Sequence, residues 1–267
     1  MFKWGIFAAV LLLNAVICGP DSYAITIGPD RLDVRLPPGE VAGADYYAQN
    51  DTDAPMHVEV EPQNWAKNSY DYTNLDIKDW ISLDCYEFDL KPKEIKKLKL
   101  TVRVPKNVKG EIAAQIYFTS SGLQAEGSLT QNVRSRLSAI LYVAIKGTEI
   151  VKGEINNISV SDTNDGKLKV EVAVKNDGNV HIWPSYGKVL IENEKGQRVA
   201  LLDLATRHSV LPNSEYAYRA MLDKAKMNEG KYRISSEIKY GKMYGKEKTM
   251  RFEKQIEVDK EGKVLAK

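Results

Sequence analysis

Hydrophobic and polar residues alternate along short segments of this chain, and turn sequences separate these segments. The longest such segment runs from Leu129 to Gly147. Every second residue from Leu129 to Ile145 is hydrophobic, except at Gln131 and Ser135, and the opposite face is polar until Ile140. Period-two alternation is typical of a strand with one buried face and one solvated face. We therefore expect a long strand here, near mid-chain, that closes a first β domain and is buried on both faces at its end.

The same alternation predicts an opening strand over Ile25–Leu36, a strand over Trp80–Leu90 and further strands throughout the chain. Strands at a spacing of roughly 8 to 12 residues, with turns between them, are typical of β-sandwiches. Outside the N-terminus, no long segment has the periodicity of an amphipathic helix. The predicted fold is all-β, with two tandem immunoglobulin-like sandwiches. The expected divisions are residues 25–147, a linker at 148–154, residues 155–258 and a charged tail at 259–267.

Residues 1–24 have the pattern of a cleaved secretion signal. A hydrophobic run over Ile6–Ile17 follows a lysine, and small residues precede a cleavage point after Ala24. The run is too short for a comfortable membrane span. The alternative is a lipoprotein acylated on Cys18, although a bulky Ile17 stands where a small residue is expected. We expect an exported protein, periplasmic or on the cell surface, without a membrane span after cleavage.

Charge and cysteine content narrow the possibilities further. The formal net charge is +2, which gives no argument for binding nucleic acid or an anionic membrane surface. Cleavage after Ala24 removes one of the two cysteines and leaves Cys85 alone. The mature chain then has no intramolecular disulfide, so its stability must come from buried hydrophobic cores. Cys85 itself is expected to be a small buried hydrophobic residue.

No motif predicts a catalytic or metal site. The three histidines, His57, His181 and His208, are far apart in sequence, and none has a cysteine or carboxylate at metal-ligand spacing. His57 falls on the solvent face of a strand, and His181 follows a turn, where a surface position or a hydrogen-bonding role is expected. Hydrolase elbows, phosphate loops and calcium loops are all absent from the sequence. We expect a non-enzymatic protein without cofactor or metal.

Aromatic residues suggest one alternative function. The sequence has 14 tyrosines, most of which we assign to core and cross-strand packing. Trp65, Tyr70 and Tyr72, with Trp183, instead fall in polar segments, where aromatic rings supply carbohydrate- or protein-binding surfaces. A cell-surface adhesion or cell-wall-binding protein is therefore the second functional hypothesis.

Three segments of the first half resemble the N-terminal domain of periplasmic pilus chaperones of the PapD-like superfamily. They are Asn50–Val60, with its turn and following strand, Ile81–Leu100, and Val133–Tyr142, which resembles the long closing strand. Lys93 stands where that family has a turn glycine. The resemblance covers roughly residues 25–146 and implies two immunoglobulin-like domains.

The chaperone resemblance also implies a mode of binding. Such proteins hold a subunit by β-augmentation, in which the partner adds a strand to an open sheet edge. It implies that Leu129–Leu141 is the pairing strand. A basic pair between the domains grips the subunit's terminal carboxylate. Arg31 matches one member, but the second falls on Ser138, so Arg134 or Arg136 is the candidate substitute. The partner-binding residues expected are Arg31, Val133, Arg134, Arg136, Leu137, Ala139 and Leu141.

A second resemblance is to WxL-associated cell-surface proteins. It is carried by Val104–Phe118 and, among related exported immunoglobulin-like domains, by Asn176–Gly196. This resemblance extends into the second half of the chain. Together the two resemblances make a pilus-assembly type chaperone the leading hypothesis, with a protein subunit as partner, and surface adhesion the alternative.

Overall fold

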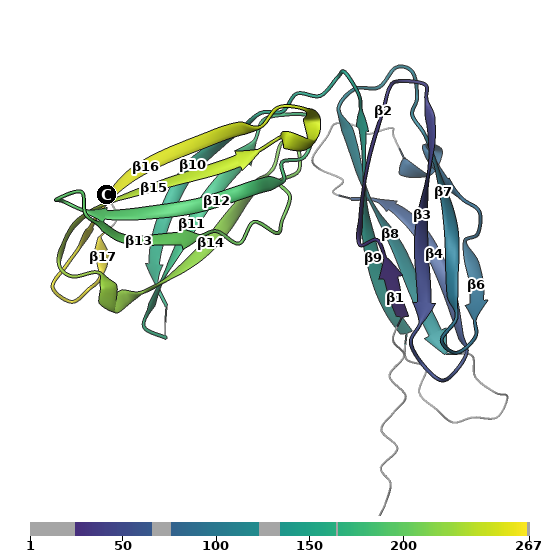
Figure 1. Cartoon of the computed structure of the whole chain (residues 1–267), viewed down its shortest axis with the longest axis horizontal. Helices are drawn as coiled ribbons and strands as arrows, with labels where there is room; N and C mark the ends of the chain where they lie inside the picture. The colour runs from purple at the N-terminus through teal and green to yellow at the C-terminus, as the bar shows by residue number, and fades with distance from the viewer. Residues whose placement is uncertain (1–24, 66–75, 123–133, 164, 266–267) are drawn as a thin grey trace, which may run out of the picture.

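The computed structural model describes residues 25–65, 76–122, 134–163 and 165–265. These residues form two β-sandwiches that meet end to end at an angle (Figure 1). The predicted all-β fold with two tandem immunoglobulin-like sandwiches is confirmed. Within the described ranges, the helical elements are three short 3-10 turns: η1 (Ile77–Asp79), η2 (Lys224–Lys226) and η3 (Lys242–Tyr244).

The first sandwich consists of a four-stranded and a five-stranded sheet. The four-stranded sheet has the order β1 (Ile25–Gly28), β3 (Val41–Asn50), β7 (Ile95–Arg103) and β5 (Ile81–Leu83). The five-stranded sheet has the order β2 (Arg31–Leu36), β9 (Arg134–Ile145), β8 (Glu111–Gly122), β4 (Met56–Asn64) and β6 (Glu87–Leu90). Within these two sheets the pairing is antiparallel except between β2 and β9, which are parallel.

The second sandwich has a three-stranded and a five-stranded sheet. The first contains β10 (Gly153–Asp162), β11 (Lys167–Asn176) and β14 (Glu215–Asp223). The other has the order β13 (Arg198–Asp203), β12 (Pro184–Asn193), β15 (Gly230–Tyr240), β16 (Lys248–Val258) and β17 (Val264–Leu265). The neighbours in these sheets are antiparallel.

Each sandwich has its own core, built from alternate residues of facing strands. Leu98, Leu100 and Val102 of β7 are fully buried in the first, and Leu168, Val170, Val172 and Val174 of β11 in the second. Burial of each such side chain contributes about 1.5–3 kcal/mol, which explains how the chain folds without a disulfide. Cys85 is half-buried and packs against the first core with a free thiol.

Two segments predicted as single strands are in fact divided between the two sheets of the first sandwich. Ile25–Leu36 divides into β1 and β2, separated by Pro29 and Asp30, and Trp80–Leu90 divides into β5 and β6. In both, the buried positions change from odd to even numbers at the break: Ile25 gives way to the partly buried Leu32, and Leu83 to Phe88. A change of phase is expected when a strand crosses to the opposite sheet, because its inward face must then point the other way.

A buried asparagine closes an equivalent turn in each sandwich. Asn50 ends β3 and Asn176 ends β11, and neither is exposed to solvent. The Asn50 side-chain amide donates to the carbonyl oxygens of Ala54 (2.8 Å) and Lys91 (3.0 Å). The Asn176 amide donates to those of Val180 (2.9 Å) and Val210 (2.8 Å). Each asparagine therefore supplies hydrogen bonds that the backbone of its turn cannot make for itself.

The predicted secretion signal at residues 1–24 lies outside the described residues. In the part of the chain that the structure describes, no helix is long and hydrophobic enough to cross a membrane.

Candidate functional site: an open strand edge beside the interdomain junction

One edge of β9 is paired over only half of its length. On one side, β8 pairs with β9 from Arg134 to Ala144. On the other side, β2 pairs with β9 only from Ile140 to Ile145. Along Arg134–Ala139, which we call the open edge, no described strand occupies that second side. Among the described strands this side stays unpaired because β1, which precedes β2, belongs to the opposite sheet.

The direction of the free backbone groups follows from the neighbouring hydrogen bonds. The Ile140 N–H donates to the Asp30 carbonyl oxygen (2.8 Å) and the Lys146 N–H to that of Leu36 (2.8 Å), so both point toward β2. Successive residues of a strand point their N–H groups to opposite sides, and β9 has no register shift. The N–H and C=O groups of Arg134, Arg136 and Ser138 therefore point toward the vacant side of the open edge.

The inward-facing residues of β9 become progressively less covered along the open edge. Leu141 and Ala139 are fully buried, whereas Leu137 is 38% exposed. Leu137 is thus a large hydrophobic side chain on the inner face that the chain itself covers incompletely. A strand added beside the open edge would bring its own inward-facing side chains next to Leu137.

The outward-facing arginines of β9 lie on the sheet surface and are not joined to Arg31. The Arg136 guanidinium pairs with Glu61 of β4 (3.2 Å) and lies 3.9 Å from the centre of the Tyr117 ring. Arg134 is exposed at the start of β9. Among the described residues, no ion pair or hydrogen bond connects either arginine to Arg31. Val133, the remaining predicted binding residue, lies outside the described residues.

Arg31 lies at the junction between the sandwiches, where the open edge ends. It is the first residue of β2 and stands opposite Ile140. Its Nε donates to Asp33 Oδ2 (2.7 Å). The guanidinium carbon lies 4.0 Å from the centre of the Trp183 ring, in the second sandwich, and 5.7 Å from that of Tyr142. Arg31 is therefore neutralised by a carboxylate and partly covered by aromatic rings.

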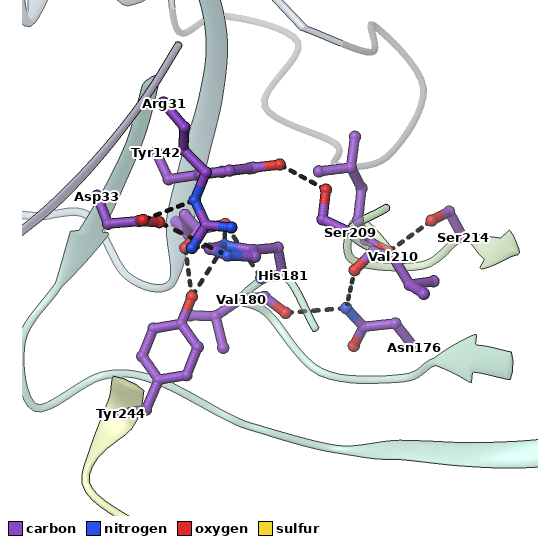
Figure 2. Close-up of polar contacts among 12 residues, drawn as sticks. Arg31, Asp33, Tyr142, Asn176, Val180, His181, Ser209, Val210, Ser214 and Tyr244 are labelled. Atoms are coloured by element: carbon purple, nitrogen blue, oxygen red, sulfur yellow. Dashed lines mark hydrogen bonds and ion pairs between the residues drawn. The ribbon is translucent and has the colours of Figure 1, made fainter. Parts of the chain in front are cut away.

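A buried polar cluster joins the two sandwiches beside Arg31 (Figure 2). Its centre is the Glu111 carboxylate of β8, whose side chain is 1% exposed. This carboxylate accepts a hydrogen bond from the backbone N–H of His181 (3.0 Å) and one from the Tyr244 hydroxyl (2.7 Å). The His181 Nδ1 lies 2.8 and 2.9 Å from its two oxygens. Three groups of the second sandwich thus converge on one carboxylate of the first.

Aromatic rings surround this cluster. The Tyr142 ring of β9 stacks on the His181 imidazole with ring centres 3.8 Å apart, and its hydroxyl contacts the Ser209 hydroxyl (2.5 Å). Burial raises the pKa of Tyr142 above its usual range. Burial, and then the Glu111 carboxylate, raise the pKa of Tyr244 well above its usual range, so its hydroxyl stays protonated as a donor. Trp65 also contacts Tyr142, with ring centres 6.0 Å apart.

The backbone between the sandwiches is held by a second set of contacts. The Asn179 side chain donates to the Thr148 carbonyl oxygen (2.9 Å) and accepts from the Ile150 N–H (2.5 Å). Gly110 has φ +80°, and a Cβ placed on it would lie 2.8 Å from the Asn179 carbonyl oxygen. Only a glycine permits this approach. The sandwiches are therefore held at a defined angle rather than joined by a free linker.

Glu149, in the linker, predicts a pH-dependent contribution to stability. Burial acts to raise its pKa, but the Arg35 side chain and the neighbouring backbone N–H groups outweigh this and lower it from 4.5. A depressed acid pKa stabilises the fold fully above the unfolded-state value, and this contribution is lost as the pH falls through the folded-state value. We expect Glu149→Gln to lower the free energy of unfolding at pH 7, and the deficit to shrink as the pH falls below 4.5. Urea unfolding of wild type and Glu149→Gln, at pH 7 and at a pH below 4.5, measures this difference in the free energy of unfolding. An equal difference at the two pH values would contradict the prediction.

The sequence reasoning missed the junction cluster. It placed His181 at the surface or in a hydrogen-bonding role; the hydrogen bonding is confirmed, but the residue is fully buried and the surface position is wrong. Glu111 was not singled out at all. The one feature of the sequence that could have drawn attention to Glu111 is its position as an acidic residue at the start of the hydrophobic alternation of β8. Nothing in the neighbouring sequence shows that His181 and Tyr244 would cover it. Tyr70 and Tyr72 lie outside the described residues.

Several solved structures match this chain at low sequence identity. The YadV chaperone is 12% identical, with a TM-score of 0.47, over 86% of this chain and 99% of that one. The SafB chaperone, solved with the Salmonella enterica SafA pilin, is 14% identical, with a TM-score of 0.45, over 88% and 98%. The E. coli chaperone DraB is 16% identical, with a TM-score of 0.41, over 87% and 98%. No curated protein sequence matches this chain.

A family model matches residues 129–264, just over half of the 267-residue chain. Its description is "WxL Interacting Protein, host binding domain", and the match runs through β9 and the whole second sandwich. The resemblance to WxL-associated proteins is thereby confirmed, and pilus chaperones, the other resemblance, are among the matched structures. The chain therefore belongs to the family of WxL-interacting proteins.

Proposed function

We propose that this protein is an exported, non-enzymatic binding protein that holds a protein partner by β-augmentation along the open edge of β9, in the manner of an assembly chaperone. The observation that carries the proposal is that Arg134–Ala139 pairs with β8 on one side and with no described strand on the other. An open edge of this kind presents unpaired backbone groups that a partner strand can satisfy. The family name adds that a WxL protein is the partner to test first.

The rest of the site supports the same function. Leu137, 38% exposed, provides a hydrophobic contact for alternate side chains of a partner strand. The junction cluster holds the second sandwich at the end of the open edge, where Asp30 pairs with Ile140. The space for a partner strand is therefore bounded at one end by β2, and among the described residues it runs beside the six residues of the open edge.

Ser138 provides a direct test, because its N–H points toward the vacant side. We expect Ser138→Pro to weaken binding of a purified WxL protein at least tenfold, which is about 1.4 kcal/mol, because proline lacks the N–H that a partner strand would need. Proline is tolerated where the N–H of an edge strand faces solvent, so the fold should persist, and circular dichroism would check this. The matched control is Ser138→Ala, which keeps the N–H and should bind as wild type. Equal affinities in the two variants would contradict the proposal.

A second candidate function is attachment to a host surface through the second sandwich. It is favoured by the description "host binding domain", which covers residues 129–264. The mature chain would then bind immobilised host matrix proteins in a pull-down assay. Retention of that binding by Ser138→Pro would show that attachment does not use the open edge, and its loss would assign both activities to one site.

A further inference from the structure

We infer that the partner contributes an internal strand to the open edge rather than its C-terminal end. This inference rests on the proposed function and specifies the kind of strand that the site accepts. A binding edge that holds a chain terminus needs an uncompensated cation where the terminal carboxylate would lie. Among the residues that the structure describes, the ion pairs of Arg31 and Arg35 leave no such cation at the β2 end of the open edge.

The two arginines of β2 are already paired. Arg31 donates to Asp33 at 2.7 Å and its side chain is only 21% exposed, beneath Trp183. Arg35 pairs with Glu149 of the linker. A second carboxylate at Arg31 would have to lie beside the Asp33 carboxylate, and like charges at that separation repel each other.

Two further carboxylates belong to this end. Asp30, whose carbonyl oxygen accepts from Ile140, has an exposed side chain, and the buried Glu111 carboxylate lies behind Arg31 in the junction cluster. Asp33 and Glu149 are the partners of Arg31 and Arg35, while His181 directs Nδ1 to Glu111. The field at this end therefore disfavours a free terminal carboxylate.

The arginines of β9 do not replace the missing cation. Arg136 is paired with Glu61 and lies on the Tyr117 ring, on the outer face of the sheet. Ile140, which stands opposite Arg31 on that face, and Ser138, the next outward-facing residue, carry no charge. Arg134 is exposed at the opposite end of the open edge, where an ion pair in water contributes only about 0–1 kcal/mol. A partner strand whose chain continues beyond the open edge in both directions places no terminal carboxylate here and so avoids the cost of an unpaired charge.

A purified WxL protein tests this in two forms: one with its natural C-terminus and one with a flexible Gly/Ser extension of about ten residues added there. The extension moves the terminal carboxylate away from any strand that the natural C-terminus could form. We expect the dissociation constants, measured by calorimetry with the wild-type chain, to agree within about twofold. A tenfold or greater loss on extension would overturn the inference.

The Ser138 variants separate this result from the proposed function. A partner that binds wild type and Ser138→Pro equally would overturn β-augmentation at the open edge, and the inference with it. Loss of binding in Ser138→Pro together with a tenfold loss on extension would leave β-augmentation standing and overturn only the internal strand. Loss of binding in Ser138→Pro with no effect of the extension is the result expected from the structure.

Discussion

Replacing Glu111 by alanine is expected to lower the free energy of unfolding by about 3–5 kcal/mol, the typical cost of removing one partner from a buried polar or ionic pair. The substitution would leave the His181 N–H, its Nδ1 and the Tyr244 hydroxyl without their common acceptor, all inside the junction. Each buried donor that is left unsatisfied costs about 1–3 kcal/mol. Solvent cannot replace the lost acceptor without separating the sandwiches.

Two variants calibrate this prediction. Tyr244→Phe removes one donor and leaves the carboxylate with His181, so we expect a loss of about 1.5–3 kcal/mol. Glu59→Ala removes an exposed glutamate of β4, in the same sheet, and should change stability by less than about 0.5 kcal/mol. Urea unfolding followed by circular dichroism measures all three. A cost for Glu111→Ala no greater than that for Glu59→Ala would mean that the cluster does not stabilise the fold.

The same cluster should control the angle between the sandwiches. Among the described residues, the hydrogen-bond partners of the Glu111 carboxylate all belong to the second sandwich. Its removal therefore weakens contacts between the sandwiches more than those within either core. We expect small-angle X-ray scattering of Glu111→Ala to show a wider distribution of interatomic distances than wild type at a temperature where both are folded. A distribution identical to that of Glu59→Ala would contradict this role.

Asn50→Ala and Asn176→Ala are expected to cost about 2–4 kcal/mol each, because each leaves two or more turn carbonyl groups without a donor. Asn50 Oδ1 also accepts from the Thr52 N–H (2.9 Å) and hydroxyl (2.7 Å), and Asn176 Oδ1 accepts from the Gly178 N–H (2.9 Å). Alanine supplies neither the donors nor the acceptor. Both side chains are fully buried, so water does not reach the groups that lose their partners.

The two asparagines lie in different sandwiches, and this gives the experiment an internal comparison. Asn50→Ala should shift the unfolding transition of the first sandwich, and Asn176→Ala that of the second, since the two cores are separate. Tyrosine and tryptophan fluorescence, recorded together with far-ultraviolet circular dichroism during urea unfolding, would follow them. Asn228→Ala, at an exposed position, is the control and should stay within about 0.5 kcal/mol of wild type. If Asn50→Ala or Asn176→Ala lowered the free energy of unfolding no more than Asn228→Ala does, this would contradict the role of that asparagine in closing its turn.

The alternation of hydrophobic residues determined much of this fold. Every second residue is buried from Leu98 to Val102 of β7, from Ala139 to Ile145 of β9 and from Leu168 to Asn176 of β11, as the sequence predicts, because a strand on a core must direct alternate side chains inward. The turns at Asn50 and Asn176 were also visible as clusters of polar residues. The sequence also marks where two segments cross from one sheet to the other, because the buried positions change from odd to even numbers at Pro29 and again between Leu83 and Phe88.

Only the tertiary structure decided which edge stays open and how the sandwiches meet. Period-two patterning specifies which face of β9 is buried. It does not specify whether any strand pairs with Arg134–Ala139, because backbone pairing leaves no pattern in the side chains. Glu111 and His181 are 70 residues apart, and Glu111 and Tyr244 are 133 apart. Each residue alone has the sequence context of a solvated turn or strand end. Their pairing arises from the packing of two sandwiches with separate cores, whose mutual contacts no local pattern encodes.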